Sequence, residues 1–281
     1  MHSTDSDAFY TEYTSHEALA KYTRATAGFG INYLLDHDYK AVYDQALRLL
    51  PEETRKRGIR VLEFGCGGGM NLIHLMSRQD GKSISVERAF GTDFSPVLIE
   101  AARRDAGAYL PEEKRRKVEF HMAKSETLID DLAAAAGMDR SKLRNSFHFI
   151  VGVNTIRYCH HFKTEKECVQ QIWELLAPGG VCVVIDMNNR FLFFKSAMKN
   201  RLGITKEEEC YIPPLEEYRA PFANAGFEVI RCEHFCWVPH SSGPFLGRVL
   251  AAASPVLDLI AKSRAMRSLI VLRKPVDGNS R

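Results

Sequence analysis

A short glycine-rich segment carries the clearest chemical signal in the sequence. Residues 61–71 read Val-Leu-Glu-Phe-Gly-Cys-Gly-Gly-Gly-Met-Asn, so an apolar run passes into a turn with alternate glycines and then into a helical segment. Glycine lets the backbone approach a bound group closely, and the N-terminus of the following helix faces that group. We therefore expect a ligand site at this turn. A dinucleotide such as NAD is disfavoured, because its fingerprint needs glycine at the sixth position from Gly65, where this chain has Met70.

Two acidic side chains accompany this turn. Glu63 lies in the apolar run before the first glycine, and Asp93 follows Gly91-Thr92 at the end of a second apolar run. Ser95-Pro96 then marks the start of a helix, which places Asp93 between a strand and a helix. A carboxylate in that position can accept charge-assisted hydrogen bonds from both hydroxyls of a ribose. An exposed aspartate in an ordinary turn is the alternative interpretation.

In order along the chain, these segments resemble motifs of the class I methyltransferases that use S-adenosylmethionine. The Glu-x-Gly-x-Gly-x-Gly turn is similar to motif I of that family, residues 91–95 are similar to its Gly-x-Asp-x-Ser segment, and the Leu-x-Pro-Gly-Gly turn at 176–180 recurs in it. The resemblance covers residues 59–186 and implies S-adenosylmethionine as the cofactor. It also implies the contacting residues, which are Glu63, Phe64, Gly65, Cys66, Gly67, Gly69, Asp93, Phe94, Ser125, Glu126 and Asn154.

The resemblance also implies what each part of the site does. In that family the glycines admit the amino acid portion of the cofactor, and an acid such as Glu63 helps to hold its ammonium group, usually through water. This chain departs from the family at Lys124, which stands where an aspartate commonly accepts the adenine amino group. Because lysine cannot accept a hydrogen bond, we expect adenine to be held by the Ser125 backbone, by Glu126 or by apolar stacking.

The elements that must position these residues alternate between β-branched runs and helical segments. We expect strands at 60–64, 86–92, 118–122, 147–153 and 181–186, and two more at 226–236 and 269–273. Such alternation is typical of βαβ units, whose right-handed crossovers make a doubly wound sheet with its ligand site at the carboxyl ends of the strands. The sequence therefore predicts an α/β fold with a doubly wound, mostly parallel seven-stranded sheet, which is the Rossmann-like methyltransferase fold that the resemblance implies.

The regions outside the sheet predict a brace and a cap. Apolar residues recur at helical spacing near the N-terminus, at Tyr39, Val42, Tyr43, Ala46, Leu47 and Leu50. We predict a helical N-terminal lid or brace over residues 1–55, an S-adenosylmethionine-binding domain over 56–281, and within it a substrate cover at 188–214. Tyrosines at 22, 33, 39 and 43 either close over the cofactor or belong to the core. Thr164 and Glu167 match a capping box for a helix before the fifth strand.

Methyl transfer from a sulfonium group requires little acid–base catalysis by protein side chains. A sulfonium methyl group is already an activated electrophile, so the protein mainly aligns an acceptor and excludes water, and no metal is required. A hydroxyl or protonated amine acceptor calls for a base near the end of the fourth strand. Tyr158, His160 and His161 are the candidate catalytic residues there. The alternatives are a hydrogen-bonding histidine pair in a loop and a tyrosine that only packs.

The acceptor is inferred from the apolar segments late in the chain. Residues 191–194, 235–237 and 245–260 favour a greasy, aromatic or lipid-linked small molecule, unless they close the domain core. With 38 basic and 35 acidic side chains the net charge is +3, so no strong field directs the chain to nucleic acid or to an acidic membrane. We therefore predict a small-molecule substrate and no nucleic acid partner. An RNA or protein methyltransferase and a non-catalytic partner subunit are the alternatives, and the oligomeric state stays open.

Composition and cysteine usage indicate the cellular compartment that we expect for the chain. Its 281 residues are 45% hydrophobic and 26% charged, which is ordinary for a globular protein. The seven cysteines are scattered, without a Cys-x-x-Cys pair or metal-type spacing, and fit a reduced, cytoplasmic compartment. The N-terminus lacks the basic start and apolar stretch of a signal peptide. Residues 181–185 and 250–260 look too short or too interrupted to span a bilayer, so we expect no transmembrane segment.

Overall fold

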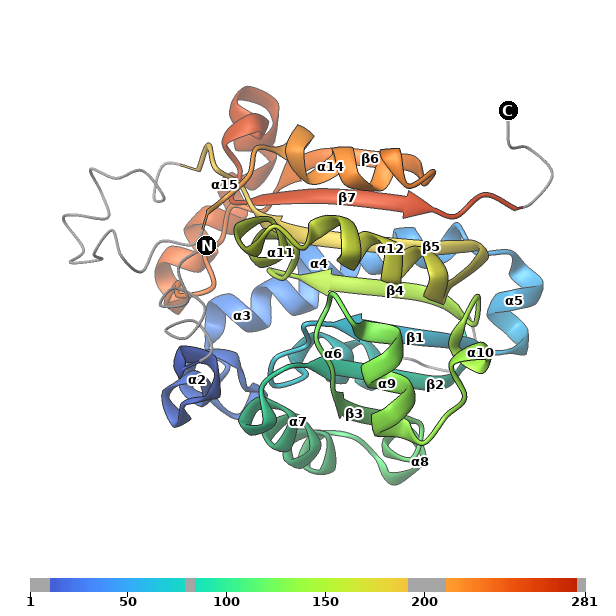
Figure 1. Ribbon diagram of the computed structural model, residues 1–281. Helices are drawn as coiled ribbons and strands as arrows, with labels where there is room; N and C mark the ends of the chain where they lie inside the picture. The colour runs from blue at the N-terminus through green and yellow to red at the C-terminus, as the bar shows by residue number, and fades with distance from the viewer. Residues whose placement is uncertain (1–10, 79–83, 192–210, 277–281) are drawn as a thin grey trace.

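A computed structural model describes residues 11–78, 84–191 and 211–276 of the chain. Within them a seven-stranded sheet has the strand order β3-β2-β1-β4-β5-β7-β6 (Figure 1). Strands β1 to β5 run parallel, while β7 is antiparallel to both β5 and β6. The predicted α/β class and the mostly parallel seven-stranded sheet are confirmed. The strands are β1 (Ile59–Phe64), β2 (Val86–Asp93), β3 (Val118–Met122), β4 (Phe147–Val153), β5 (Leu176–Met187), β6 (Glu228–Phe235) and β7 (Arg267–Arg273).

The strand order reverses between β1 and β4. Phe64 at the end of β1 is level with Thr92 of β2 and with Gly152 of β4, so the carboxyl ends of these three strands meet at one edge. The loops after β1 and β4 diverge from this point toward opposite faces of the sheet. In open α/β sheets such a reversal leaves a crevice where ligands bind.

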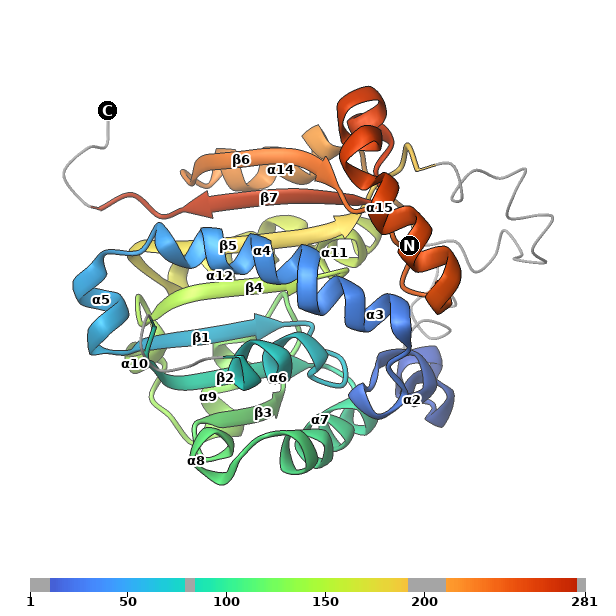
Figure 2. The same cartoon turned by 180° about the vertical axis from the view of Figure 1, so that it is seen from behind.

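Helices cover both faces of the sheet (Figures 1 and 2). One face carries η2 (Leu34–Asp38), α4 (Tyr39–Arg48), α6 (Met70–Ser77) and α7 (Pro96–Tyr109). The other carries α9 (Leu128–Ala136), α11 (Ile156–Phe162), α12 (Glu165–Leu175) and α14 (Leu215–Asn224). Adjacent strand residues alternate between the two cores, as Val61 and Leu62 do, because successive side chains point to opposite faces. The remaining elements are α2 (His16–Tyr22), η1 (Arg24–Thr26), α3 (Phe29–Tyr33), α5 (Glu52–Arg57), α8 (Glu112–Arg115), α10 (Arg140–Leu143), α15 (Pro244–Ala261) and η5 (Lys262–Arg264).

The N-terminal helices form part of the layer that covers the sheet. The predicted apolar stripe is confirmed as the buried face of α4, and it shares one core with β1, β4 and β5. The ring of Tyr43 meets Phe149 of β4 edge-on, with the ring centroids 6.1 Å apart. The domain boundary at residue 55 stays a prediction. The buried face of α4 belongs to the same core as the strands and the crossover helices α6 and α7.

Of the two predicted helix caps, the one at Ser95 is confirmed and the one at Thr164 is not. Ser95 caps α7 as expected, since its hydroxyl accepts a hydrogen bond from the Leu98 N–H at 3.3 Å and Pro96 is the first helical residue. The capping box at Thr164 is wrong, because the Thr164 side chain makes no cap hydrogen bond to α12. Lys163 takes a left-handed conformation (φ 59°) and turns α11 directly into α12. Thr164 contributes to the wall of a cavity instead.

One helix of the described residues has the length and composition of a membrane span. Within residues 244–264, an 18-residue window reaches a mean hydropathy of 1.4, and 6% of that window is buried. The expectation that this region is too short or too interrupted is therefore wrong, because the apolar run begins at Pro244 and α15 continues through Pro255. The idea that residues 245–260 close the core is also wrong, since Gly247 is the buried residue of α15. Most of the predicted cover at 188–214 lies outside the described residues.

The packing of α4 leads to a test of the brace. Leu47 is 2% exposed, so Leu47→Ala leaves a cavity in the core shared with the sheet. We expect the whole chain to lose about 2–5 kcal/mol of unfolding free energy in a single urea transition followed by circular dichroism. Arg48→Ala, on the exposed side of α4, should change stability by less than about 0.5 kcal/mol. A separate early transition of the N-terminal helices would contradict the shared core.

Candidate functional site

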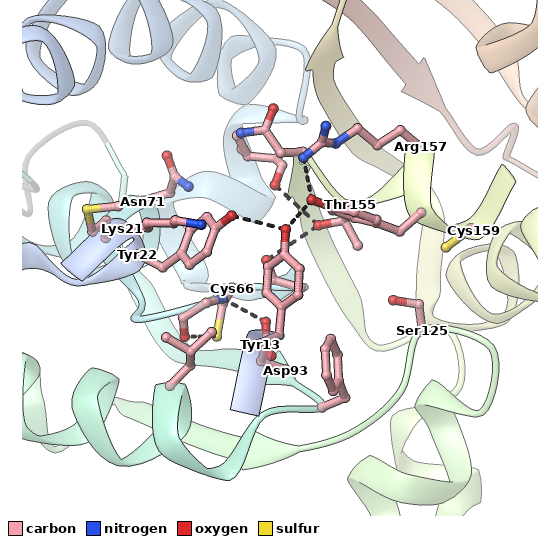
Figure 3. Close-up of a pocket in the computed structure, with 18 of the residues that line it drawn as sticks. Tyr13, Lys21, Tyr22, Cys66, Asn71, Asp93, Ser125, Thr155, Arg157 and Cys159 are labelled. Atoms are coloured by element: carbon pink, nitrogen blue, oxygen red, sulfur yellow. Dashed lines mark hydrogen bonds between the residues drawn. The ribbon is translucent and has the colours of Figure 1, made fainter. Parts of the chain in front are cut away.

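A cavity of about 740 Å³ lies at the carboxyl edge of the sheet, at the strand-order reversal (Figure 3). Its wall comes from the loops after β1, β2, β3 and β4, from the N-terminal helices, and from the start of β7. The structure brings most of the predicted cofactor residues together in this wall. They are Gly65, Cys66, Gly67, Asp93, Phe94, Ser125, Glu126 and Asn154. Glu63, Phe64 and Gly69 lie behind it.

The glycine turn owes its path to left-handed backbone conformations. φ is +61° at Gly65, +52° at Gly67 and +75° at Gly69, a region that residues with a Cβ rarely adopt. Space is restricted as well, because a Cβ on Gly65 would lie 2.2 Å from the hydroxyl oxygen of Thr155. A Cβ on Gly69 would lie 2.7 Å from the Phe120 ring, so Gly69 serves packing behind the turn. Gly65 and Gly67 leave a stretch of cavity wall without side chains.

Gly68 has a role that the sequence analysis missed. Its N–H donates a hydrogen bond to the carbonyl of Tyr22 at 2.9 Å, and Gly68 pairs with Thr23 in an isolated parallel bridge. A Cβ at this position would lie 2.2 Å from the Tyr22 carbonyl oxygen. Glycine at 68 therefore lets the N-terminal segment dock against the turn. The local sequence offers no signal for this, because the partner strand segment is remote in the chain.

Glu63 supports the turn from beneath. Its side chain is fully buried and accepts hydrogen bonds from the Asn71 amide at 2.9 Å and from the Leu72 N–H at 3.0 Å. Burial raises its pKa to about 8, although these two hydrogen bonds act in the opposite direction. Glu63 therefore holds the first turn of α6, while Asn71, which the sequence analysis did not single out, lies in the cavity wall. The neighbouring Phe64 side chain points into the opposite core.

Asp93 lies in the cavity wall and ties two strand ends together. One carboxylate oxygen accepts from the Gly67 N–H at 2.9 Å, and the other accepts from the Ser95 N–H at 2.9 Å. The residue is 7% exposed, so the alternative of an exposed turn aspartate is wrong. Burial raises the pKa of Asp93 to about 6, against the backbone hydrogen bonds that lower it. A backbone hydrogen bond from Phe94 also reaches the carboxylate, which keeps acceptor capacity for a ligand hydroxyl.

The loop after β3 forms one end of the cavity. Lys124, Ser125 and Glu126 all line it, and the Lys124 N–H donates to Asp131 at 2.9 Å, which shapes the loop. Phe94 and Leu98 supply apolar surface in the same wall. This end thus combines hydrogen-bond acceptors with apolar faces, the mixture that a flat heteroaromatic ring requires.

Three tyrosines join the N-terminal segment to α11. The Tyr13 hydroxyl is within hydrogen-bond distance of Tyr22, at 3.0 Å, and also pairs with Tyr158, which accepts from Arg157 (Figure 3). Burial is the main cause that raises the pKa of Tyr13. Ser95 fixes the segment by donating to the Tyr13 carbonyl at 2.6 Å. The sequence analysis missed Tyr13, because residues 11–15 show no apolar periodicity and the partners are far away in the chain.

The sequence left open whether the N-terminal tyrosines close over the cofactor or belong to the core, and the structure contains examples of both positions. Tyr22 and Tyr39 line the cavity, whereas Tyr43 is a core residue. Tyr33 does not line the cavity, and its ring stacks on Phe29 and lies tilted against His37.

The predicted base candidates point in different directions from α11. Tyr158 and Phe162, one helical turn apart, both line the cavity. His160 and His161 lie on the other faces of the same helix and do not line it. The His160 ring packs edge-on against Tyr218 with centroids 5.6 Å apart, and burial lowers its pKa. His161 packs against Phe162.

A second, polar part of the wall lies at the ends of β4, β5 and β7, where Asn154, Arg157 and Arg267 line the cavity. Behind it, Asp186 is 1% exposed and accepts hydrogen bonds from the backbone N–H groups of Arg157, at 3.0 Å, and of Met187, at 2.8 Å. The Arg157 guanidinium forms an ion pair with it, with Nε 3.6 Å from the carboxylate. Arg267 donates to the side-chain oxygen of Asn154, which takes a left-handed conformation (φ 57°). Across residues 11–78, 84–191 and 211–276, no cluster of His, Cys, Asp or Glu is arranged to hold a metal ion.

The burial of Glu63 generates a pH test. Its folded pKa of about 8 lies above the ordinary value of 4.5, so the folded state binds a proton more tightly than the unfolded chain. Stability contributed by the protonated form is complete below about pH 4.5 and is lost as the pH rises toward about 8. Glu63→Gln keeps an acceptor for the Leu72 N–H without the titrating proton. We expect wild type to lose a few kcal/mol relative to the variant over this range in urea unfolding.

Asp93 titrates in both proteins, so the difference between the two stability curves isolates Glu63. Parallel curves across that pH range would contradict a raised pKa at Glu63.

Comparison with known proteins agrees with this geometry. A family model described as a methyltransferase domain matches residues 35–231. No curated protein sequence matches the chain. Among solved structures, the CMeT domain of the citrinin polyketide synthase has a TM-score of 0.58 at 15% identity, over 93% of this chain and 58% of that one.

Two further structures share the fold at low identity. A candidate methyltransferase in complex with the Trm112 methyltransferase activator of Haloferax volcanii gives a TM-score of 0.53 at 16% identity, over 97% of this chain and 96% of that one. Phosphoethanolamine N-methyltransferase 2 of Haemonchus contortus, in complex with S-adenosyl-L-methionine, gives 0.53 at 16%, over 96% and 57%. The matched family range contains the glycine turn, Asp93 and the loops after β3 and β4. The chain therefore belongs to the class I S-adenosylmethionine-dependent methyltransferase family.

Proposed function

We propose that the enzyme transfers the methyl group of S-adenosylmethionine to a small molecule with an apolar or aromatic body. The observation that carries the proposal is a cavity that continues beyond the glycine turn and Asp93 into a largely apolar wall. Ile31, Leu34, Leu35 and Met187 contribute to that wall. Apolar pockets with a few polar groups are typical of sites for small organic ligands.

The donor set of the cavity fits the cofactor in three places. The wall without side chains at Gly65 and Gly67 admits the amino acid portion, and the remaining acceptor capacity of the Asp93 carboxylate suits the ribose hydroxyls. Ser125 and Glu126 with the nearby Phe94 ring suit the adenine. Glu63 supports this arrangement through Asn71 and the start of α6.

When bound, the cofactor supplies a sulfonium methyl group that needs no further activation. The residues of this chain then have to orient the acceptor and keep water out. Tyr13 and Tyr22 serve the second task, because they hold the N-terminal segment over the cavity through hydrogen bonds to each other and to Tyr158. Exclusion of water strengthens every electrostatic contact in the site.

Tyr158 is the base candidate whose side chain lies in the cavity. We assign it the contact with the proton of a hydroxyl or amine acceptor. His160 and His161 have no part in this assignment, because their rings pack on Tyr218 and Phe162.

The cofactor site is tested by Asp93→Asn. The change removes the charge from the hydrogen bonds offered to the ribose, so we expect S-adenosylmethionine and S-adenosylhomocysteine to bind about 10- to 100-fold more weakly in calorimetric titration. Wild-type affinity should also fall as the pH drops through about 6, where Asp93 takes up a proton. Asp130→Asn, at an exposed carboxylate of α9 that pairs with Arg140 and lies outside the cavity wall, is the matched control.

Binding of neither compound by the wild type would contradict the proposal and favour a non-catalytic partner subunit. The acceptor class is tested by incubating the enzyme and methyl-labelled cofactor with fractionated cell extract. Label in the organic small-molecule fraction supports the proposal, and label confined to RNA or protein contradicts it.

A further inference from the structure

Arg267 is a buried cation in the cavity wall. It is 5% exposed, and its guanidinium makes one hydrogen bond, from Nη1 to the side-chain oxygen of Asn154. Its Nε is buried without a hydrogen-bond partner. No carboxylate of the described residues forms an ion pair with it. Burying a charge without a counter-ion is costly, and proteins that keep such a charge pair it with something.

The nearby charges offset Arg267 only in part, because one buried carboxylate lies beside two guanidinium groups. Asp186, behind this part of the wall, is near enough for the Arg267 charge to lower its pKa, but it forms its ion pair with Arg157 and accepts two backbone N–H groups. His240, which also lines the cavity, has its pKa lowered by burial and then by Arg267 and Arg157, which favours the neutral imidazole, so it supplies no counter-charge. Tyr39 is neutral, because burial raises its pKa. The polar end of the cavity therefore has an excess of positive charge.

From this excess we infer that the methyl acceptor carries an oxyanion, a carboxylate or a phosphate ester, that binds Arg267. A planar guanidinium suits such groups because it offers parallel N–H donors. The apolar wall from Ile31, Leu34 and Leu35 then holds the rest of the molecule, so the acceptor is an amphipathic acid. This inference rests on the proposed function, because it names the substrate class of the same cavity.

Calorimetric titration of the protein saturated with S-adenosylhomocysteine tests the inference. The probes are two matched pairs, octanoate with 1-octanol and benzoate with benzyl alcohol. We expect at least one acid to bind about tenfold or more tightly than its alcohol, and Arg267→Gln to remove that preference while leaving alcohol affinity unchanged. Lys21→Gln, at an exposed cation that also lines the cavity, should leave the preference intact.

The controls separate the possible failures. Arg267→Lys keeps the charge and should recover part of the acid preference, so misfolding of Arg267→Gln would not decide the question. Acids that bind no more tightly than alcohols, or variants that weaken both alike, overturn the inference. Saturation with S-adenosylhomocysteine is measured first, and its failure would instead contradict the proposed function.

A second inference comes from an independent feature, the exposed face of α15. Phe245, Val249, Val256, Leu259 and Ile260 recur at helical intervals and share one side of the helix, where Phe245 is 83% and Leu259 is 86% exposed. The opposite side meets the rest of the protein at Gly247, where a Cβ would lie 2.2 Å from the Phe29 ring. Scattered apolar residues on a surface are ordinary, but a continuous apolar helix face marks a binding surface.

The segment that contains α15 leaves the sheet after Phe235 of β6 and returns at Arg267 of β7, two residues that pair with each other. Before the helix, the Gly30 N–H of α3 donates to the Ser242 carbonyl at 3.2 Å. After it, the Met266 N–H donates to the Cys236 carbonyl at 2.8 Å, next to the pairing of Phe235 with Arg267. A helix that leaves and returns at one edge can lie on a bilayer but cannot cross it while the sheet is intact. Figure 2 shows α15 beside α3, at the edge where the cavity lies.

We infer that α15 docks the enzyme on an anionic lipid surface. Arg248 and Arg264 are exposed and form no ion pair with a carboxylate of the described residues. Asp258 is the acidic residue of the helix, and its carboxylate accepts a hydrogen bond from the Trp237 indole at 2.7 Å. An apolar face with basic residues beside it is the pattern of interfacial helices, which gain from apolar burial and from attraction to anionic headgroups.

Vesicle co-sedimentation tests the docking. The vesicles are phosphatidylcholine alone and phosphatidylcholine with phosphatidylglycerol at about three to one. We expect the mixed vesicles to bind more protein, and the double variant Phe245→Ser with Leu259→Ser to lose about tenfold or more of that binding. Tyr109→Ser with Val276→Ser, at exposed apolar residues elsewhere, is the matched control and should bind as wild type.

Binding that is absent, or equal in the two double variants, overturns this second inference. Sedimentation velocity tests whether a second copy of the chain, and not lipid, binds this apolar face. A wild-type dimer that the Phe245 and Leu259 substitutions dissociate would assign the surface to a second copy of the chain and not to lipid.

Discussion

A hydrogen bond from the Gly67 N–H to the buried carboxylate of Asp93 joins the ends of β1 and β2. The rest of the site depends on it. Together with Glu63, which holds the start of α6 from beneath, it keeps the glycine turn in its left-handed path. Burial raises the pKa of both carboxyl groups, so the fold accepts a desolvation cost to keep them there. What this arrangement provides is a wall without side chains beside a strong hydrogen-bond acceptor.

The N-terminal segment completes the cavity through contacts that are distant in sequence. The Tyr22 carbonyl accepts from Gly68, the Tyr13 carbonyl accepts from Ser95, and the Ala25 N–H donates to Asp105. These hydrogen bonds bring aromatic side chains over the glycine turn. The matched family range begins at residue 35, so this closure is built by residues outside the recognisable domain.

The acceptor end of the cavity also depends on residues outside that range. The connection between β6 and β7 contains α15, and Arg267 is the first residue of β7, so both follow residue 231, where the matched family range ends. Arg267 places a buried cation in the cavity, and α15 presents an apolar face to the surroundings. An amphipathic acid drawn from a membrane surface would meet both features in turn. The glycine turn and Asp93 lie within the matched family range, whereas Arg267 and α15 lie outside it.

The sequence by itself determined the sheet, the glycine turn and Asp93, because strand periodicity, left-handed glycines and a capped helix start are local properties of the chain. It could not determine that Glu63 faces α6, that His160 turns away from the cavity, or that Tyr13 enters it. Those facts depend on which side of an element a neighbour occupies and on hydrogen bonds across 80 or more residues. The sequence could not predict the exposure of α15 either, because a helix buried in the core and a helix that faces outward can have the same apolar composition. Burial of Arg267 without an ion pair to a described carboxylate is likewise a property of the assembled site and not of its local sequence.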